Sequence, residues 1–203
     1  MSLILSVDLA AKLSAVILRR AGGGAGDGIV TEFDSRDKTP LRFLQEIAIY
    51  AKDADMVIVE DVPYGISNQS MIKPVVRLQG ALCAYLTAKG CLDKTLFMSP
   101  SVWMRDYPGT QTATTKGLSK SASDKERIET ARTHAERLGY TPPDLVSEYV
   151  ATLPEGKKVL KKNTAILEKS MTDYVSAFLM AEFSRAFTFE ELLAKPGVSL
   201  ATL

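Results

Sequence analysis

Short apolar runs, separated by turn residues and amphipathic stretches, dominate the first hundred residues. Residues 3–8, 15–19 and 29–33 are three such runs, parted by the turn DLAAKLS and the glycine-rich segment AGGGAGDG. They predict a three-stranded antiparallel meander. Residues 56–60 (MVIVE) form a continuous apolar run typical of a central parallel strand, and residues 96–98 are a further short strand candidate.

Helical spacing of apolar residues predicts the remaining elements. Pro40 opens one helix, and residues 70–89 form a long second one. Ser123 and Glu126 have the spacing of a capping box before a third helix, which Gly139 closes. A final long helix follows, with apolar residues at Met171, Val175, Phe178, Leu179 and Phe183. After it comes a short tail helix with a capping signal at Thr188 and Glu191.

The order of these elements predicts an α/β fold whose mixed five-stranded sheet joins the antiparallel meander to parallel strands and is flanked by helices. We expect one domain over residues 1–187 and a short C-terminal helical tail over residues 188–203. The glycine-rich segment lies between two strands with no helix after it, which argues against a phosphate-binding loop. The polar stretch 99–123 predicts a mobile loop.

Composition narrows the chemistry. At 203 residues the chain suits one compact domain, and 25 basic against 24 acidic residues mean that attraction to nucleic acid needs local patches. Two cysteines make no disulfide framework and fit a reducing, cytoplasmic setting, and we expect neither a signal segment nor a membrane span. A single histidine, His134, argues against zinc sites and histidine triads. Catalysis would therefore depend on carboxylates.

Three acidic residues stand where an isolated charge is costly. Asp8 ends the first apolar strand, Glu60 ends MVIVE, and Asp173 lies among apolar residues of the last long helix. Buried carboxylates need partners, and divalent metal ions can hold several together. Taken singly, each is equally well explained as a helix cap or as one half of an ion pair. Asp61 points to the opposite face from Glu60 and is expected to be structural.

The segments that contain these acids resemble motifs of the RuvC-type Holliday junction resolvases, members of the ribonuclease H-like superfamily. ILSVDLAAKLSAVIL resembles their first two strands, VIVEDVPYGI with MIKPVVRLQGALCAYL their second acidic motif and long helix, and TDYVSAFLMA their C-terminal acidic helix. With SPSVWMR the resemblance spans most of residues 1–187, and the order and spacing of the motifs are its most specific feature. The chain resembles a bacteriophage-type or otherwise divergent member.

The resemblance implies a ribonuclease H-like fold, a Holliday junction endonuclease activity, and Asp8, Glu60 and Asp173 as catalytic metal ligands. A fourth ligand position holds Ser170, so Ser170, the nearby Glu168 or a water would complete the site. Oxygen ligands suit Mg²⁺ or Mn²⁺, and two ions about 3.5–4 Å apart can activate water and stabilise the leaving oxygen of a phosphodiester. We expect two ions per subunit, and the resemblance implies 5′-phosphate and 3′-hydroxyl products.

Several lysines are candidates for contacts with DNA. Lys116, Lys120 and Lys125 lie in or just after the polar loop and could neutralise charge on the scissile phosphate, which makes Lys116 and Lys120 catalytic candidates as well. A second set of phosphate-contact candidates consists of Lys157, Lys158, Lys161 and Lys162. Both sets are alternatively solvated, solubilising faces.

Two aromatic residues lie near the motifs. The resemblance places Tyr64, in VPYGI, where resolvases carry a wedge at the junction centre, and an exposed tyrosine can stack on an unpaired base. A core tyrosine is the alternative. Trp103 is expected to pack in the interior, and His134 to be exposed.

The expected partners are branched DNA, namely four-way junctions with forks and flaps as further candidates, and a second copy of the chain. Helix 70–89 has one apolar stripe for its own sheet, at Met71, Val75, Leu78, Leu82 and Leu86. A second stripe, at Ile72, Val76 and Cys83, is available for a two-fold partner or, alternatively, for the C-terminal helices of the same chain. Two alternatives to a nuclease remain: a non-catalytic branched-DNA-binding scaffold of the same fold, and an actin-like phosphotransferase, which needs two copies of the fold.

Overall fold

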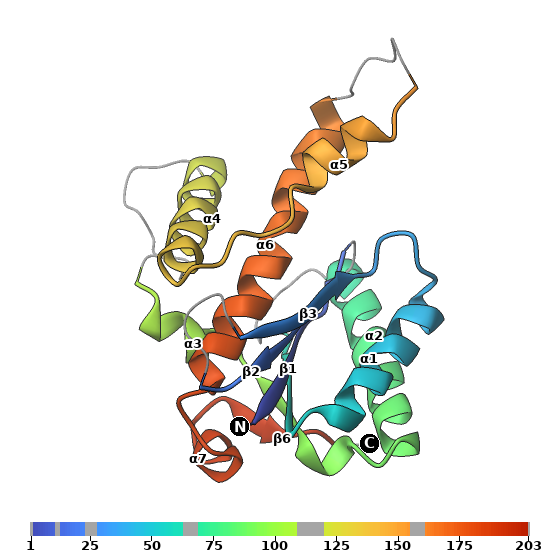
Figure 1. Ribbon diagram of the computed structural model, residues 1–203, viewed down its shortest axis with the longest axis vertical. Helices are drawn as coiled ribbons and strands as arrows, with labels where there is room; N and C mark the ends of the chain where they lie inside the picture. The colour runs from blue at the N-terminus through green and yellow to red at the C-terminus, as the bar shows by residue number, and fades with distance from the viewer. Residues whose placement is uncertain are drawn as a thin grey trace.

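A six-stranded mixed sheet forms the centre of the chain, with the strand order β3-β2-β1-β4-β5-β6 (Figure 1). The computed structural model describes residues 2–10, 13–22, 28–62, 69–108, 120–154 and 161–202, without the side chains of residues 69–71, 120–124, 161, 162, 165 and 169. The strands are β1 (Leu3–Asp8), β2 (Ala15–Arg20), β3 (Ile29–Asp34), β4 (Met56–Glu60), β5 (Thr95–Met98) and β6 (Val198–Leu200). Strands β1 to β3 form an antiparallel meander, β4 and β5 continue the sheet in parallel with β1, and β6 closes it antiparallel to β5.

Helices cover both faces of the sheet. They are α1 (Pro40–Asp53), α2 (Gln69–Ala88), α3 (Pro100–Trp103), α4 (Lys120–Arg137), α5 (Leu145–Ala151), α6 (Lys161–Ser184) and α7 (Phe189–Leu193), with short 3-10 helices at Leu92–Lys94 and Met104–Asp106. Helices α1 and α2 pack on one face, while α6 crosses the other with α4 beside it (Figure 1). Helix α5 lies against the N-terminal part of α6, beyond the sheet. No helix among the described residues is long and apolar enough to cross a membrane.

The predicted mixed α/β architecture is confirmed, with one strand more than predicted. Residues 198–200 are too few to show a strand period, and they become β6 because the edge of β5 hydrogen-bonds the tail. Ser99 N–H donates to the Gly197 carbonyl at 2.9 Å, and Ala201 N–H donates to the Thr95 carbonyl at 2.9 Å. The tail therefore extends the sheet as well as forming its predicted helix.

Helix ends show where local signals succeed and fail. The capping box of Thr188 and Glu191 is present, and Gly139 adopts the positive φ of 78° that ends the third predicted helix. Ser123, in contrast, lies inside α4, which begins at Lys120, so the predicted capping box there is wrong. The residues just before Ser123 tolerate helical geometry, and a capping sequence alone does not stop a helix from extending past it.

Two further sequence expectations need correction. Part of the predicted loop 99–123 is helical, since α3 begins at Pro100, and α5 was not predicted at all. His134 is partly buried and its Nε2 lies 3.0 Å from the Pro108 carbonyl oxygen, although its helix is mostly polar. Trp103 packs in the core with 1% of its surface exposed, as predicted.

A buried ion pair fixes one end of α6 on the sheet. Arg19, on β2, is fully buried, and its Nη2 lies 2.7 Å from Glu182 Oε2 on α6. Its guanidinium also lies over the Phe178 ring, 4.8 Å from the ring centroid. Burial lowers the pKa of Arg19, and the negative charge of Glu182 opposes this effect. Arg185 Nε contacts the other Glu182 oxygen at 2.7 Å, so one carboxylate serves two guanidinium groups.

This arrangement predicts that replacing Glu182 and replacing Arg19 lower the free energy of unfolding in urea by different amounts. Glu182→Gln should lower the free energy of unfolding by about 3–5 kcal/mol, because it leaves a buried arginine uncompensated. Arg19→Met should lower it less, since Glu182 keeps Arg185. The double variant should recover part of the Glu182→Gln loss. A larger loss for Arg19→Met than for Glu182→Gln would contradict this account.

Candidate active site

Asp8 and Glu60 lie side by side at the ends of neighbouring parallel strands. The last paired residues of β1 and β4 are Val7 and Val59, and each acid follows directly. Because side chains alternate along a strand, both acids point away from Val7 and Val59 and toward the face that α6 covers. Their carboxyl groups share a hydrogen bond. Two of the three predicted acidic residues are therefore in contact.

Burial makes this pair hold protons strongly. Loss of hydration raises the pKa of Asp8 to about 7, although hydrogen bonds with Glu60 and Ser176 act in the opposite direction. The pKa of Glu60 is raised well above its ordinary value by burial and by the negative charges of Asp8 and Asp173. The shared hydrogen bond lowers the pKa of Asp8 and raises that of Glu60, so the two carboxyl groups titrate as a pair.

Helix α6, which covers this face of the sheet, supplies the third acid, Asp173. Asp173 is partly buried and close enough for its charge to act on Glu60, and Ser176, one turn further on, hydrogen-bonds Asp8. Over the described ranges, however, no three His, Cys, Asp or Glu side chains are gathered closely enough to hold a metal ion. Two oxygen donors in direct contact, with a third acid nearby, fit the ligand chemistry of Mg²⁺ or Mn²⁺.

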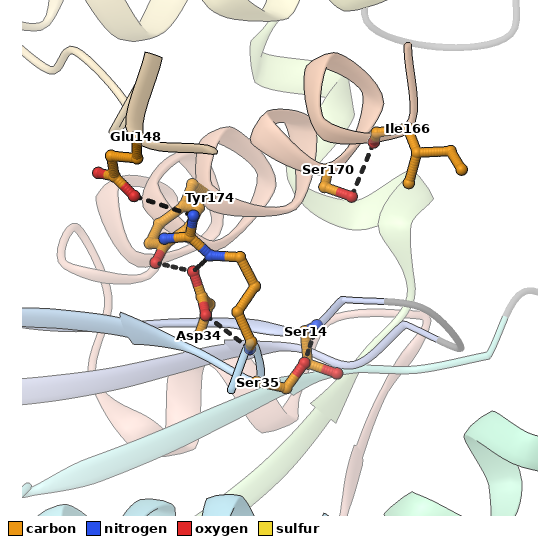
Figure 2. A network of polar contacts seen from close by, with 8 residues as sticks. Ser14, Asp34, Ser35, Glu148, Ile166, Ser170 and Tyr174 are labelled. Atoms are coloured by element: carbon orange, nitrogen blue, oxygen red, sulfur yellow. Dashed lines mark hydrogen bonds and ion pairs between the residues drawn. The ribbon is translucent and has the colours of Figure 1, made fainter. Parts of the chain in front are cut away.

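The candidates for a fourth ligand point elsewhere. The Ser170 hydroxyl is buried and donates to the Ile166 carbonyl of its own helix at 2.9 Å (Figure 2). Glu168 is exposed on α6, and five residues before Asp173 place it about 140° around the helix. Neither joins the acid pair in this arrangement, and their roles as ligands stay predictions. Asp61 accepts a hydrogen bond from the Val62 N–H at 2.8 Å, in keeping with its expected structural role.

Most of the predicted DNA-contact residues lie outside what the structure describes. This is so for Tyr64, Lys116, Lys157 and Lys158, and for the side chains of Lys120, Lys161 and Lys162. Lys120 itself is the first residue of α4. Lys125 is exposed on the same helix, as a phosphate contact requires.

Sequence reasoning missed one basic residue at the site. Arg127 precedes Ala131 and Ala135 by one and two helical turns, so it continues the stripe of α4 that faces the core beside α6. Its positive charge lowers the pKa of Glu60, against the stronger effect of burial. The signal that could have found it is this helical spacing, which puts a cation in line with the partly buried Ala131 and the buried Ala135.

In the metal-free protein the acid pair should contribute less to stability as the pH rises, which is the reverse of an acid held in an ion pair. The pKa of Asp8 is about 7 when folded and about 3.9 when unfolded, so the folded state binds protons more tightly. The contribution of Asp8 to the free energy of unfolding should thus be largest below pH 4 and fall as the pH rises through 7. Asp8→Asn removes this cost and should raise the free energy of unfolding at pH 8 by about 2–4 kcal/mol.

Urea unfolding in the presence of a chelator at pH 4 and pH 8 measures this effect. The difference between variant and wild type should shrink toward pH 4, where Asp8 is protonated in the folded state and about half protonated in the unfolded state. Asp61→Asn serves as the control, because it changes an adjacent acid outside the pair. Equal effects of Asp8→Asn at both pH values would reject the buried, proton-sharing arrangement.

Comparison with known proteins gives weak structural similarity. No protein-family model matches the chain, and no curated protein matches it either. Among solved structures, T. thermophilus RuvC in complex with a Holliday junction substrate has a TM-score of 0.46 at 9% identity, covering 91% of this chain and 98% of that one. A second Thermus thermophilus RuvC structure has a TM-score of 0.41 at 12% identity, covering 88% and 97%. The Fowlpox virus resolvase, solved with Holliday junction DNA, has a TM-score of 0.42 at 14% identity, covering 89% and 97%. At these scores the function has to be inferred from this chain's own residues.

Proposed function

We propose that this chain is a metal-dependent endonuclease that cuts branched DNA, with the four-way junction as its main substrate. The observation that carries the proposal is that Asp8 and Glu60, from two separate motifs, share a hydrogen bond beneath the helix that bears Asp173. These are the acids that the resemblance to resolvases selects as ligands. Their burial is costly, and a divalent cation would offset that cost.

In the proposed reaction Asp8 and Glu60 would hold Mg²⁺ or Mn²⁺, two ions per subunit, with Asp173 as the third acid. A bound ion would act as a Lewis acid toward the phosphodiester and would lower the pKa of the attacking water molecule. The acid pair must first release the proton that it shares. Ser176 then keeps Asp8 oriented through its hydrogen bond, and Arg127 favours the ionised form of Glu60.

Basic residues of α4 would hold the DNA next to the acids. Lys125 is exposed and is the first residue of this helix whose side chain the structure describes, and Arg127 lies two residues later on its inner side. Phosphate contacts of this kind release counterions, so DNA binding should weaken steeply as salt increases. Lys116, Lys120 and the 157–162 segment remain candidates for further contacts.

The direct test incubates the protein with a labelled four-way junction, a fork, a flap and a linear duplex, with and without Mg²⁺. We expect Mg²⁺-dependent cuts near the branch point and little cutting of the duplex. The non-catalytic scaffold is the second candidate, favoured by the lack of a three-ligand group among the described side chains. Junction binding without any cleavage in Mg²⁺ or Mn²⁺ would select the scaffold.

Neutralising the acids should separate cleavage from binding. We expect Glu60→Gln and Asp173→Asn each to reduce junction cleavage by at least about 100-fold, because each removes negative charge from the metal site. Junction affinity, measured by gel shift in Ca²⁺, should stay within about threefold of wild type. Asp61→Asn is the matched control and should cut normally. Wild-type cleavage by Glu60→Gln would remove that residue from the site.

A symmetric homodimer is part of the proposal, since a junction offers two equivalent strands to two active sites. Helix α2 packs Leu82 and Leu86 against its own sheet, as predicted for its first stripe. In the second stripe Val76 is 49% exposed and Ile72 is partly exposed. Cys83 is buried within the subunit, so its predicted place in the partner surface is wrong. The surface offered to a partner is therefore centred on Val76.

Val76→Glu should convert a dimer into a folded monomer, because it places a charge at the centre of an apolar contact. Light scattering at micromolar concentration measures the mass, and a junction assay measures whether both strands are cut together. Val150→Glu, on α5, is the control for a similarly exposed valine. A monomeric wild-type protein would reject the dimer without rejecting the nuclease.

A further inference from the structure

Another acid, Asp34, lies in the same row across the sheet as Asp8 and Glu60. Asp34 pairs with Ala15 in the β3–β2 ladder, and Ala15 pairs with Asp8 in the β2–β1 ladder. Residues paired in this way project to the same face, so Asp34 also lies under α6. Two strand spacings separate Asp34 from Asp8, about 10 Å, which is too far for both to bind one ion.

Asp34 is satisfied in a way that the other two acids are not. Its Oδ2 accepts a hydrogen bond of 2.7 Å from the Tyr174 hydroxyl and one of 2.7 Å from Arg36 Nε, and its Oδ1 accepts one of 2.7 Å from the Arg36 N–H. Asp34 and Tyr174 are both buried, with 6% and 3% of their surface exposed. Figure 2 shows Tyr174 reaching from α6 to Asp34 on the sheet. A buried hydrogen bond to a compensated charge is rigid and specific in direction.

Tyr174 directly follows Asp173, and this adjacency joins the contact to the active site. Consecutive helical residues are about 100° apart, so Tyr174 meets Asp34 while Asp173 and Ser176 are turned toward Asp8 and Glu60. A side chain end lies about 5–6 Å from the helix axis, so turning α6 by about 20° would shift the Asp173 carboxylate by about 2 Å. Metal ligands tolerate only a few tenths of an ångström.

We propose that Tyr174, held by Asp34 and Arg36, is a positioning residue that sets the rotation of α6 and thereby places Asp173 at the metal site. This inference rests on the proposed function, because it concerns the same acids. The ion pair of Arg36 Nη1 with Glu148, 2.9 Å long, extends the contact to α5. Glu148 has 53% of its side chain exposed, so its share in the positioning is small.

The chain offers a matched control for this contact. The Tyr140 hydroxyl donates to Glu32 Oε2 at 2.9 Å, also on β3, and Tyr140 has 3% of its surface exposed. Tyr140→Phe and Tyr174→Phe therefore each delete one buried tyrosine–carboxylate hydrogen bond and keep the ring. Only Tyr174 lies on α6, next to Asp173.

The experiment measures Mn²⁺ binding to the full-length wild type and to both variants by electron paramagnetic resonance of free Mn²⁺, together with melting temperature. Both variants should melt slightly below the wild type, by similar amounts. Tyr174→Phe should weaken Mn²⁺ binding about tenfold, while Tyr140→Phe should stay within about twofold of wild type. Asp34→Asn, which keeps an acceptor for Tyr174 but weakens the pairing with Arg36, should fall between them.

Two results would overturn the inference, and they are distinguishable. Wild-type affinity in Tyr174→Phe, or the same loss in Tyr140→Phe, would show that the contact serves stability alone, and the proposed nuclease site would stand. Failure of the wild type to bind Mn²⁺ would reject the metal site itself, and the positioning role with it.

Discussion

Ionisable side chains buried between α6 and the sheet are the constraint on which the rest of this structure depends. Each buried charge needs a partner, and the chain meets that need in different ways along one interface. Glu182 is shared by Arg19 and Arg185, and Asp34 is held by Arg36 and Tyr174. Asp8 and Glu60 instead share a hydrogen bond between two acids, with Ser176 as a further partner of Asp8. That difference separates the acids that hold the fold from the acids proposed to act.

The same physics links stability to the proposed activity. A proton shared between Asp8 and Glu60 keeps the metal-free pair neutral enough to be buried, and a divalent cation would take over that role when the proton leaves. Arg127, on α4, favours the ionised form of Glu60 through its positive charge. Without a metal ion at neutral pH, such a site destabilises the folded state, as is common for catalytic centres.

Helix α6 connects these parts because it crosses β1 and β2 and carries polar contacts along its length (Figure 1). Glu182 near its C-terminal end and Tyr174 near its middle are attached to different strands. Two such attachments fix both the position of a helix along its axis and its rotation. The acid at position 173 then needs little reorganisation to meet the acids of the sheet, which is the advantage of building a site on rigid elements.

The sequence by itself determined the strands of the meander, the central strand that ends at Glu60, the long helices and the three acidic candidates, because hydrophobic period and a charge at a strand end are local signals. It could not reveal β6, since three residues have no period and pair only because β5 offers an edge. Nor could it show that Asp34 pairs with an arginine whereas Asp8 pairs with another acid, because the two residues look alike at the ends of their strands. Strand register and the rotation of α6 decide which side chain meets Arg36 and Tyr174, and both depend on contacts between residues far apart in the chain.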